Sequence, residues 1–206
     1  MIYKGAFSLL LTIYLLAGCS NAQKTEVTKT SSAESKVLIV YLSRTSNTKA
    51  VAEFIREKVG GTLVGVELEK PYPENYRETV AQVARENETG FLPTLKTKID
   101  KIEQYDTIYL GFPTWGMQLP PPMKSFLRQY ALKGKTVVPF NTNGGYGEGS
   151  SFQTVKELCT GCNLLEGFVT KGGNERDGVK LAIRDARADE VRVAVHEWLD
   201  RLKVAK

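Results

Sequence analysis

The sequence predicts an α/β fold in which a doubly wound, five-stranded parallel sheet is covered by helices on both faces. Two observations support this prediction. Apolar runs of strand length alternate with longer stretches of helical periodicity, which is typical of parallel strands joined by crossover helices. The run Val37–Leu42 is also continuously apolar, as expected of a central strand buried on both sides. Residues 37–206 have the length of one domain with a full core.

The elements follow one another in a regular order. After the first strand, Val51, Ala52 and Ile55 recur at helical spacing, and Gly60-Gly61 stops this helix near Val59. The segment 172–189 receives no assignment. We expect further strands over residues 62–68, 107–112, 135–140 and 164–168, and further helices over 76–88, 122–130, 150–158 and around 191–202.

Residues 1–18 are predicted to be an export signal. Lys4 supplies a positive start, and the apolar run over residues 7–17 is too short to remain as a membrane-spanning helix. The segment ends in Leu16-Ala17-Gly18-Cys19, which resembles the lipobox of bacterial lipoproteins. This resemblance implies lipidation of Cys19, export, and a membrane anchor that faces the periplasm if the cell is Gram-negative. An ordinary cleaved signal and an uncleaved anchor remain alternatives.

Residues 19–36 are then expected to be the lipidated cysteine and a flexible tether, because they contain too few apolar side chains to offset the entropy cost of ordering. Removal of residues 1–18 deletes Lys4 and no acid, so the formal net charge falls only from +5 to +4. This charge is mild and scattered, which argues against a nucleic-acid partner. The folded domain is expected over residues 37–206.

The cysteines and the single histidine predict neither a metal site nor a catalytic residue. His196 and one CxxC pair provide too few ligands for zinc. Cys159 and Cys162 could close as a disulfide in an oxidising compartment, or remain two thiols.

The first loop, residues 43–48, separates a buried strand from a helix start and is rich in short polar side chains. Hydroxyl groups and the N–H groups of a helix N-terminus together favour a phosphate. The loop lacks both GxxxxGK[ST] and GxGxxG, so a phosphate monoester without bound magnesium fits better than a triphosphate. An ordinary Ser/Thr helix cap would explain the same residues. The candidate ligands are Ser43, Arg44, Thr45, Ser46, Asn47 and Thr48.

Two further loops follow the third and fourth predicted strands, and each combines glycine with an aromatic residue. In the second loop, residues 111–120, Trp115 offers a flat apolar face and Gly116 permits close backbone approach to a ligand. In the third loop, residues 141–150, Tyr146 could stack on a ligand or cover it. A Trp packed into the core and a mobile loop without a ligand are the alternatives. The candidate ligands are Pro113, Thr114, Trp115, Gly116 and Met117 in the second loop, and Thr142, Asn143, Gly144, Gly145 and Tyr146 in the third.

Together these three loops resemble those of the single-domain flavodoxin branch. The first is similar to the family's S/T-x-T-G-N-T phosphate loop, from which it departs at Ser46, where the family usually has glycine. The resemblance covers residues 37 to about 170 and implies the strand order 2-1-3-4-5, which the family shares with other doubly wound folds. It also implies that the three loops surround one FMN.

The resemblance implies an electron-transfer flavoprotein that holds FMN non-covalently, since no D-x-x-[ST]-G-A-[ST] segment for flavin attachment is found. Its partner would be a redox protein or a small-molecule acceptor, with the membrane reached through the lipid anchor. Two alternatives remain open. One is an FMN-dependent NAD(P)H or quinone reductase, and the other is a flavin-free binding module on the same fold.

Overall fold

The structure is a computed structural model that describes residues 1–2 and 36–202. Residues 3–18 of the predicted signal segment, Cys19 and residues 20–35 of the predicted tether therefore lie outside the described residues. Residues 36–202 contain the whole predicted sheet.

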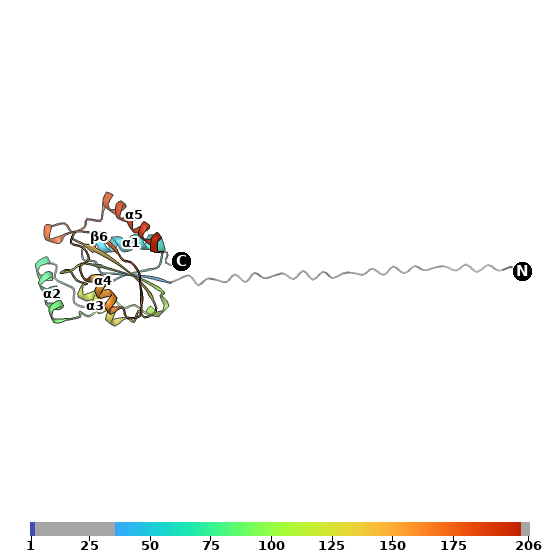
Figure 1. Cartoon of the computed structure of the whole chain (residues 1–206), viewed down its shortest axis with the longest axis horizontal. Coiled ribbons are helices and arrows are strands. Elements are labelled where there is room, and N and C mark those ends of the chain that lie inside the picture. The colour runs from blue at the N-terminus through green and yellow to red at the C-terminus, as the bar shows by residue number, and fades with distance from the viewer. Residues whose placement is uncertain (3–35, 203–206) are drawn as a thin grey trace. The chain divides into compact units, whose positions relative to one another are not determined.

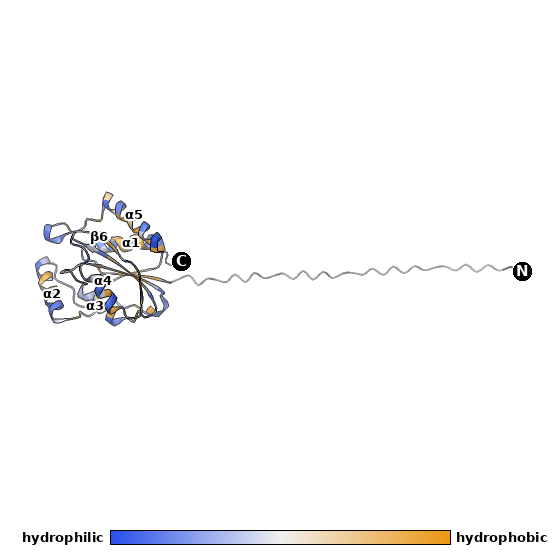
Figure 2. Cartoon of the chain, viewed as in Figure 1, coloured by the Kyte–Doolittle hydropathy of each residue, from blue (hydrophilic) through white to orange (hydrophobic). Residues whose placement is uncertain are grey.

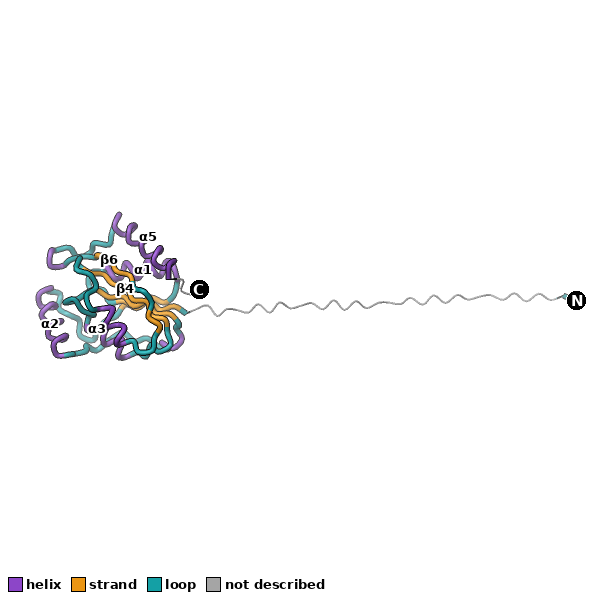
Figure 3. Tube along the Cα trace, viewed as in Figure 1, coloured by secondary structure: helices purple, strands orange, loops and turns teal. Residues whose placement is uncertain are grey.

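A parallel sheet forms the middle layer, with helices on either side (Figure 3). The strand order β2-β1-β3-β4-β5 confirms the predicted order. Every pair is parallel, so the carboxyl ends of the strands meet at one edge of the sheet. The strands are β1 (Val37–Tyr41), β2 (Thr62–Gly65), β3 (Thr107–Pro113), β4 (Thr136–Asn143), β5 (Asn163–Leu164) and β6 (Phe168–Lys171).

The predicted edge strand over residues 164–168 is instead two short strands, β5 and β6, which both pair with β4. The break lies opposite Pro139. The carbonyl of Val137 accepts a hydrogen bond from the N–H of Leu165 (3.0 Å), so alternate residues of β4 direct their backbone groups toward this edge. Pro139 is one of these residues and has no N–H to donate, so the ladder is interrupted there.

Helices α1 (Asn47–Val59) and α5 (Asp185–Leu202) cover one face, and α3 (Pro121–Gln129) and α4 (Ser151–Leu158) cover the other (Figure 1). Helix α2 (Tyr76–Thr89) lies beside α3. Two short 3-10 helices, η1 (Ile102–Gln104) and η2 (Glu175–Asp177), complete the order. No helix in residues 36–202 is long and apolar enough to cross a membrane.

The core confirms that the central strands are buried on both sides. In β1, Leu38 and Val40 pack in the cluster under α3 and α4, whereas Ile39 packs in the cluster under α1 and α5. All three side chains are fully buried. The hydropathy colouring in Figure 2 places the apolar residues in the central strands, while the helices carry hydrophilic stretches outward.

Candidate functional site

A cleft of about 660 Å³ lies at the carboxyl ends of β1, β3 and β4, where the three predicted loops meet. Its volume is within the usual range for small-molecule sites. Of the predicted ligands, all line the cleft except Ser43, Ser46 and Gly145. The predicted residues that do line it are Arg44, Thr45, Asn47, Thr48, Pro113, Thr114, Trp115, Gly116, Met117, Thr142, Asn143, Gly144 and Tyr146.

The first loop presents a row of free amide donors. Ser46 is the N-cap of α1 and adopts the left-handed conformation (φ 64°, ψ 1°) that glycine adopts without cost. No acceptor in the described part of the chain takes a hydrogen bond from the backbone N–H groups of residues 45–48. Consecutive N–H groups around a left-handed residue form an anion-binding concavity, and the helix dipole adds to it. The residues present therefore suit a phosphate group.

Two hydroxyl groups of this loop have partners within the protein. Ser43 Oγ accepts from the backbone N–H of Lys49 (3.3 Å) and does not line the cleft. Thr48 Oγ1 lies 2.8 Å from Thr142 Oγ1, which ties the first loop to the end of β4. The loop binds its own neighbours through side chains and leaves the backbone amides for a ligand.

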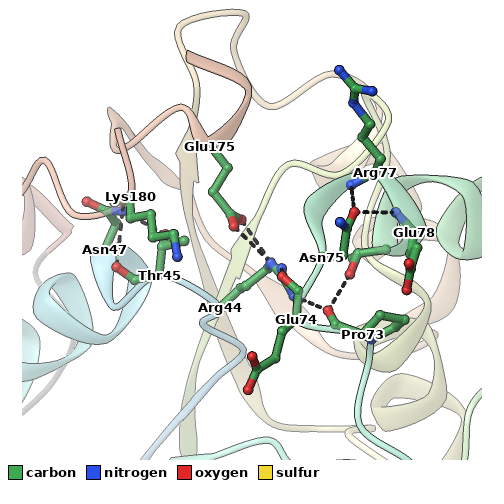
Figure 4. A network of polar contacts seen from close by, with 11 residues as sticks. Arg44, Thr45, Asn47, Pro73, Glu74, Asn75, Arg77, Glu78, Glu175 and Lys180 are labelled. Carbon is green, nitrogen blue, oxygen red and sulfur yellow. Dashed lines mark hydrogen bonds and ion pairs between the residues drawn. The ribbon is translucent and has the colours of Figure 1, made fainter. Parts of the chain in front are cut away.

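Asn47 connects the first loop to residues 172–183, which we call the strap. Its amide donates to the carbonyl of Lys180 (2.7 Å) and to Thr45 Oγ1 (2.9 Å), and its oxygen accepts from the N–H groups of Ala182 and Ile183 (2.9 and 3.0 Å). The side chain is buried. Figure 4 shows Asn47 between Thr45 and Lys180. Although Asn47 lines the cleft, its polar atoms are occupied by the protein itself.

Arg44 is occupied in the same way. Its Nε donates to both carboxylate oxygens of Glu175 in the strap (2.9 and 3.2 Å), and its terminal nitrogens donate to the carbonyls of Pro73 and Glu74 (2.9 and 2.6 Å) (Figure 4). Arg44 therefore holds the strap and the turn before α2 against the first loop.

The second loop forms a tight turn at the mouth of the cleft. Trp115 and Gln118 exchange backbone hydrogen bonds (3.2 and 3.1 Å), and the two residues between them both have positive φ, as in a type I′ turn. Met117 is the second of these and is 46% exposed. Its carbonyl accepts from the N–H of Ser150 (3.0 Å), which joins the turn to the start of α4.

The side chain of Trp115 packs against Tyr72. Its ring meets Tyr72 edge-on, with centroids 5.2 Å apart and planes at 86°. The Tyr72 hydroxyl donates to the carboxylate of Glu86, which is buried and also accepts from Gln82 (2.8 Å). Burial, together with the bond to Glu86, holds the pKa of Tyr72 far above its usual 10.0. Trp115 thus lines the cleft on a fixed support.

The third loop is shaped by Asn143. Its Oδ1 accepts from the N–H groups of Gly145 and Gly147 (2.9 and 3.1 Å), an arrangement by which Asn stabilises turns. Tyr146 is 72% exposed. The backbone of the loop is therefore organised while its aromatic side chain stays open to solvent.

Two walls of the cleft were missed in the sequence. One is α2, where Val80, Val83 and Ala84 face the cleft, which explains why the apolar face of this helix looks thin for a core helix. The other is the strap, whose Gly172-Gly173 pair was the available signal. A Cβ at Gly173 would lie 1.9 Å from the carbonyl oxygen of Lys180, so glycine is needed for the strap to turn back on itself. The missed lining residues are Tyr76, Thr79, Val80, Val83, Ala84, Asn87, Glu88, Gln118, Gly147, Gly172, Gly173, Asn174, Glu175 and Arg176.

Cys159 and Cys162 lie away from this cleft. A disulfide joins Cys159, at the end of α4, to Cys162. Asn163, the next residue, pairs with Thr136 at the start of β4, whereas the cleft lies beyond the end of that strand.

Comparisons with known proteins agree with this fold. A family model described as flavodoxin matches residues 36–185. The chain is similar to a protein from Bacteroides eggerthii assigned as a flavoprotein, with 30% identity and a TM-score of 0.67, covering 83% of this chain and 99% of that one. It is also similar to such a protein from Bacteroides uniformis, with 25% identity and a TM-score of 0.66, covering 81% and 98%.

A flavoprotein from Lactobacillus acidophilus, solved in complex with FMN, shares 23% identity and a TM-score of 0.59, covering 66% of this chain and 93% of that one. At this identity the likeness shows the fold alone. No curated protein matches the chain.

Proposed function

Because the chain belongs to the flavodoxin family, we propose that it holds one FMN non-covalently in the cleft and uses it to carry electrons outside the cytoplasm. The observation that carries the proposal is the meeting of three loops at one cleft, with free amides at one end and Trp115 and Tyr146 at the other. The phosphate of FMN would meet the free amides, and its flavin ring would meet the two aromatic side chains. When bound, FMN supplies the redox chemistry.

The chain's own residues would bind and orient the FMN. The amides of residues 45–48 would hold the phosphate without a metal, and Trp115 would stack on the ring and exclude water. Gly116, at φ 58° and without a side chain, would let the backbone come close to the ring edge.

A visible absorption spectrum tests the cofactor. The chain would be purified with Cys19→Ser, so that it carries no lipid, and measured before and after addition of FMN and dialysis. Retained bands near about 375 and 450 nm, where oxidised flavin absorbs, would support the proposal. A colourless protein that fails to retain added FMN would favour a flavin-free binding module.

A second function, an FMN-dependent NAD(P)H or quinone reductase, is favoured by one observation. The cleft continues along α2, where Val80, Val83 and Ala84 form an apolar wall beyond the three predicted loops. Such a wall would suit a second, apolar substrate. A steady-state assay with NADPH and a quinone separates the two functions, because an electron carrier alone would not turn over.

The location of the protein is also part of this proposal. The segment Leu16-Ala17-Gly18-Cys19 supports lipidation of Cys19 and a membrane anchor. Labelling with radioactive palmitate in a bacterial host should mark the chain, and Cys19→Ser should abolish the label. The mature net charge of +4 suits a redox partner with an acidic surface.

A further inference from the structure

Two cationic side chains, Arg44 and Arg176, line the cleft in the part of the chain that the structure describes. They differ in their surroundings. Arg44 is largely buried, pairs with Glu175 and donates to two backbone carbonyls, as Figure 4 shows. These contacts use three of the five N–H donors of the Arg44 guanidinium, and Glu175 balances its charge.

Arg176 is the next residue after Glu175, in the 3-10 helix of the strap. It is exposed, and it forms no ion pair with any residue in 36–202. Its guanidinium is therefore available, whereas that of Arg44 is used.

The strap, to which Arg176 belongs, is joined to the first loop by several contacts. Glu175 reaches Arg44, Lys180 and Ala182 bond to Asn47, and a Cβ at Gly172 would lie 3.0 Å from Asn47 Cβ. Each of these contacts joins the strap to residues 44–47. Because Arg176 lines the cleft and directly follows Glu175, its backbone lies close to the first loop that carries Arg44.

We propose that Arg176 binds the phosphate group of the cofactor, while Arg44 is a positioning residue that holds the strap in place. This inference rests on the proposed binding of FMN. A guanidinium presents paired N–H donors that match phosphate oxygens, and such charge-assisted bonds are about twice as strong as neutral ones. The amides of residues 45–48 supply the remaining donors.

Titration with FMN and with riboflavin tests the inference, because the two ligands differ only in the phosphate. For Arg176→Gln we expect the Kd for FMN to rise about tenfold and the Kd for riboflavin to stay unchanged. The difference in Kd for FMN between Arg176→Gln and the wild type should become smaller at high salt, since an exposed charge is screened. Arg128→Gln is the matched control, because Arg128 is an exposed arginine of α3 outside the cleft, and both Kd values should stay unchanged.

Arg44→Gln separates positioning from direct binding. Loss of its bonds to the strap and to Pro73 should weaken both flavins to a similar extent. If Arg44→Gln weakens FMN alone while Arg176→Gln leaves both Kd values within about twofold, the inference is overturned and Arg44 is the phosphate ligand. If the wild-type chain binds neither flavin, the proposed function fails, and the inference fails with it.

Discussion

The two ends of the cleft are built in different ways. The first loop, residues 43–48, forms the proposed phosphate end. There, the buried side chains of Asn47 and Thr48 join the loop to the strap and to β4. The second and third loops form the proposed ring end. There, Met117 and Tyr146 are exposed, although the backbone of both loops is held by hydrogen bonds. The phosphate end is thus complete before a ligand arrives, whereas the ring end leaves apolar surface for a ligand to cover.

This difference follows from the chemistry of the two ends. Backbone amides bind an anion well only if they are already aligned, so the first loop requires a rigid frame. A flat ring gains affinity from buried apolar area, which requires a surface rather than a fixed set of donors. Substitution of a buried framework residue such as Asn47 should therefore change stability, whereas substitution of an aromatic side chain that lines the cleft should change ligand affinity.

The largest expected effect is at Asn47. Asn47→Ala leaves the carbonyl of Lys180 and the N–H groups of Ala182 and Ile183 without partners, so we expect a loss of about 3 kcal/mol in the free energy of unfolding. Urea unfolding measures it. Asn163→Ala is the control, because that exposed side chain makes one long bond of 3.4 Å. A loss below about 1 kcal/mol would show that the strap is not held by Asn47.

At the ring end, Trp115→Ala should weaken FMN binding by about 2 kcal/mol, or roughly 30-fold, through loss of stacking area. Fluorescence titration measures the Kd. Trp115→Phe should retain part of the affinity, since it keeps a flat ring. Equal Kd values for the wild type and Trp115→Ala would contradict the stacking role.

Tyr72 makes the support of the ring end sensitive to alkaline pH. The pKa of Tyr72 is raised in the folded protein. Its contribution to the free energy of unfolding is therefore complete below pH 10.0, the pKa in the unfolded chain, and is progressively lost as the pH rises from there toward the folded pKa. Tyr72→Phe leaves Glu86 with one partner fewer and should cost about 1.5 kcal/mol at pH 7. Urea unfolding from pH 7 to 11 should show the two proteins converging above pH 10.0. A constant difference across this range would disprove the link to ionisation.

The smallest effect is a gain at the first loop. Ser46 has a positive φ, so Ser46→Gly should relieve backbone strain and raise the free energy of unfolding by about 1 kcal/mol. Thermal unfolding measures it, and Ser46→Ala should give no such gain because alanine keeps the strain. No rise in Tm for Ser46→Gly would mean that the left-handed position costs nothing here.

Much of the site could be predicted because its residues follow the strands directly. Trp115 and Thr142 lie at or just after the carboxyl ends of neighbouring parallel strands, and Thr48 lies in the first turn of the helix after β1, so a correct sheet order brings them together. The α2 wall could not be found in this way. Val80 and Ala84 look like weak core residues along the chain, and only the packing of α2 beside α3 turns them toward the cleft.

Arg44 as a phosphate ligand stays a prediction, but its surroundings show what local reasoning leaves out. The first loop by itself indicates a cation beside a phosphate site, and nothing near it in the chain contradicts this. Glu175 lies 131 residues away along the chain, and its carboxylate accepts a hydrogen bond from the Nε of Arg44. The edge strand is a similar case, since its break depends on Pro139 in the neighbouring strand.

The sequence by itself determined the alternation of strands and helices, the buried central strand and the three loops, because periodicity, glycine and proline act over a few residues. The tertiary structure decided which polar groups remain free. Asn47 and Arg44 are used by the strap, while the amides of residues 45–48 and the side chain of Arg176 are left available. A hydrogen-bond donor serves either the protein or a ligand, and only the folded arrangement shows which donors already have partners.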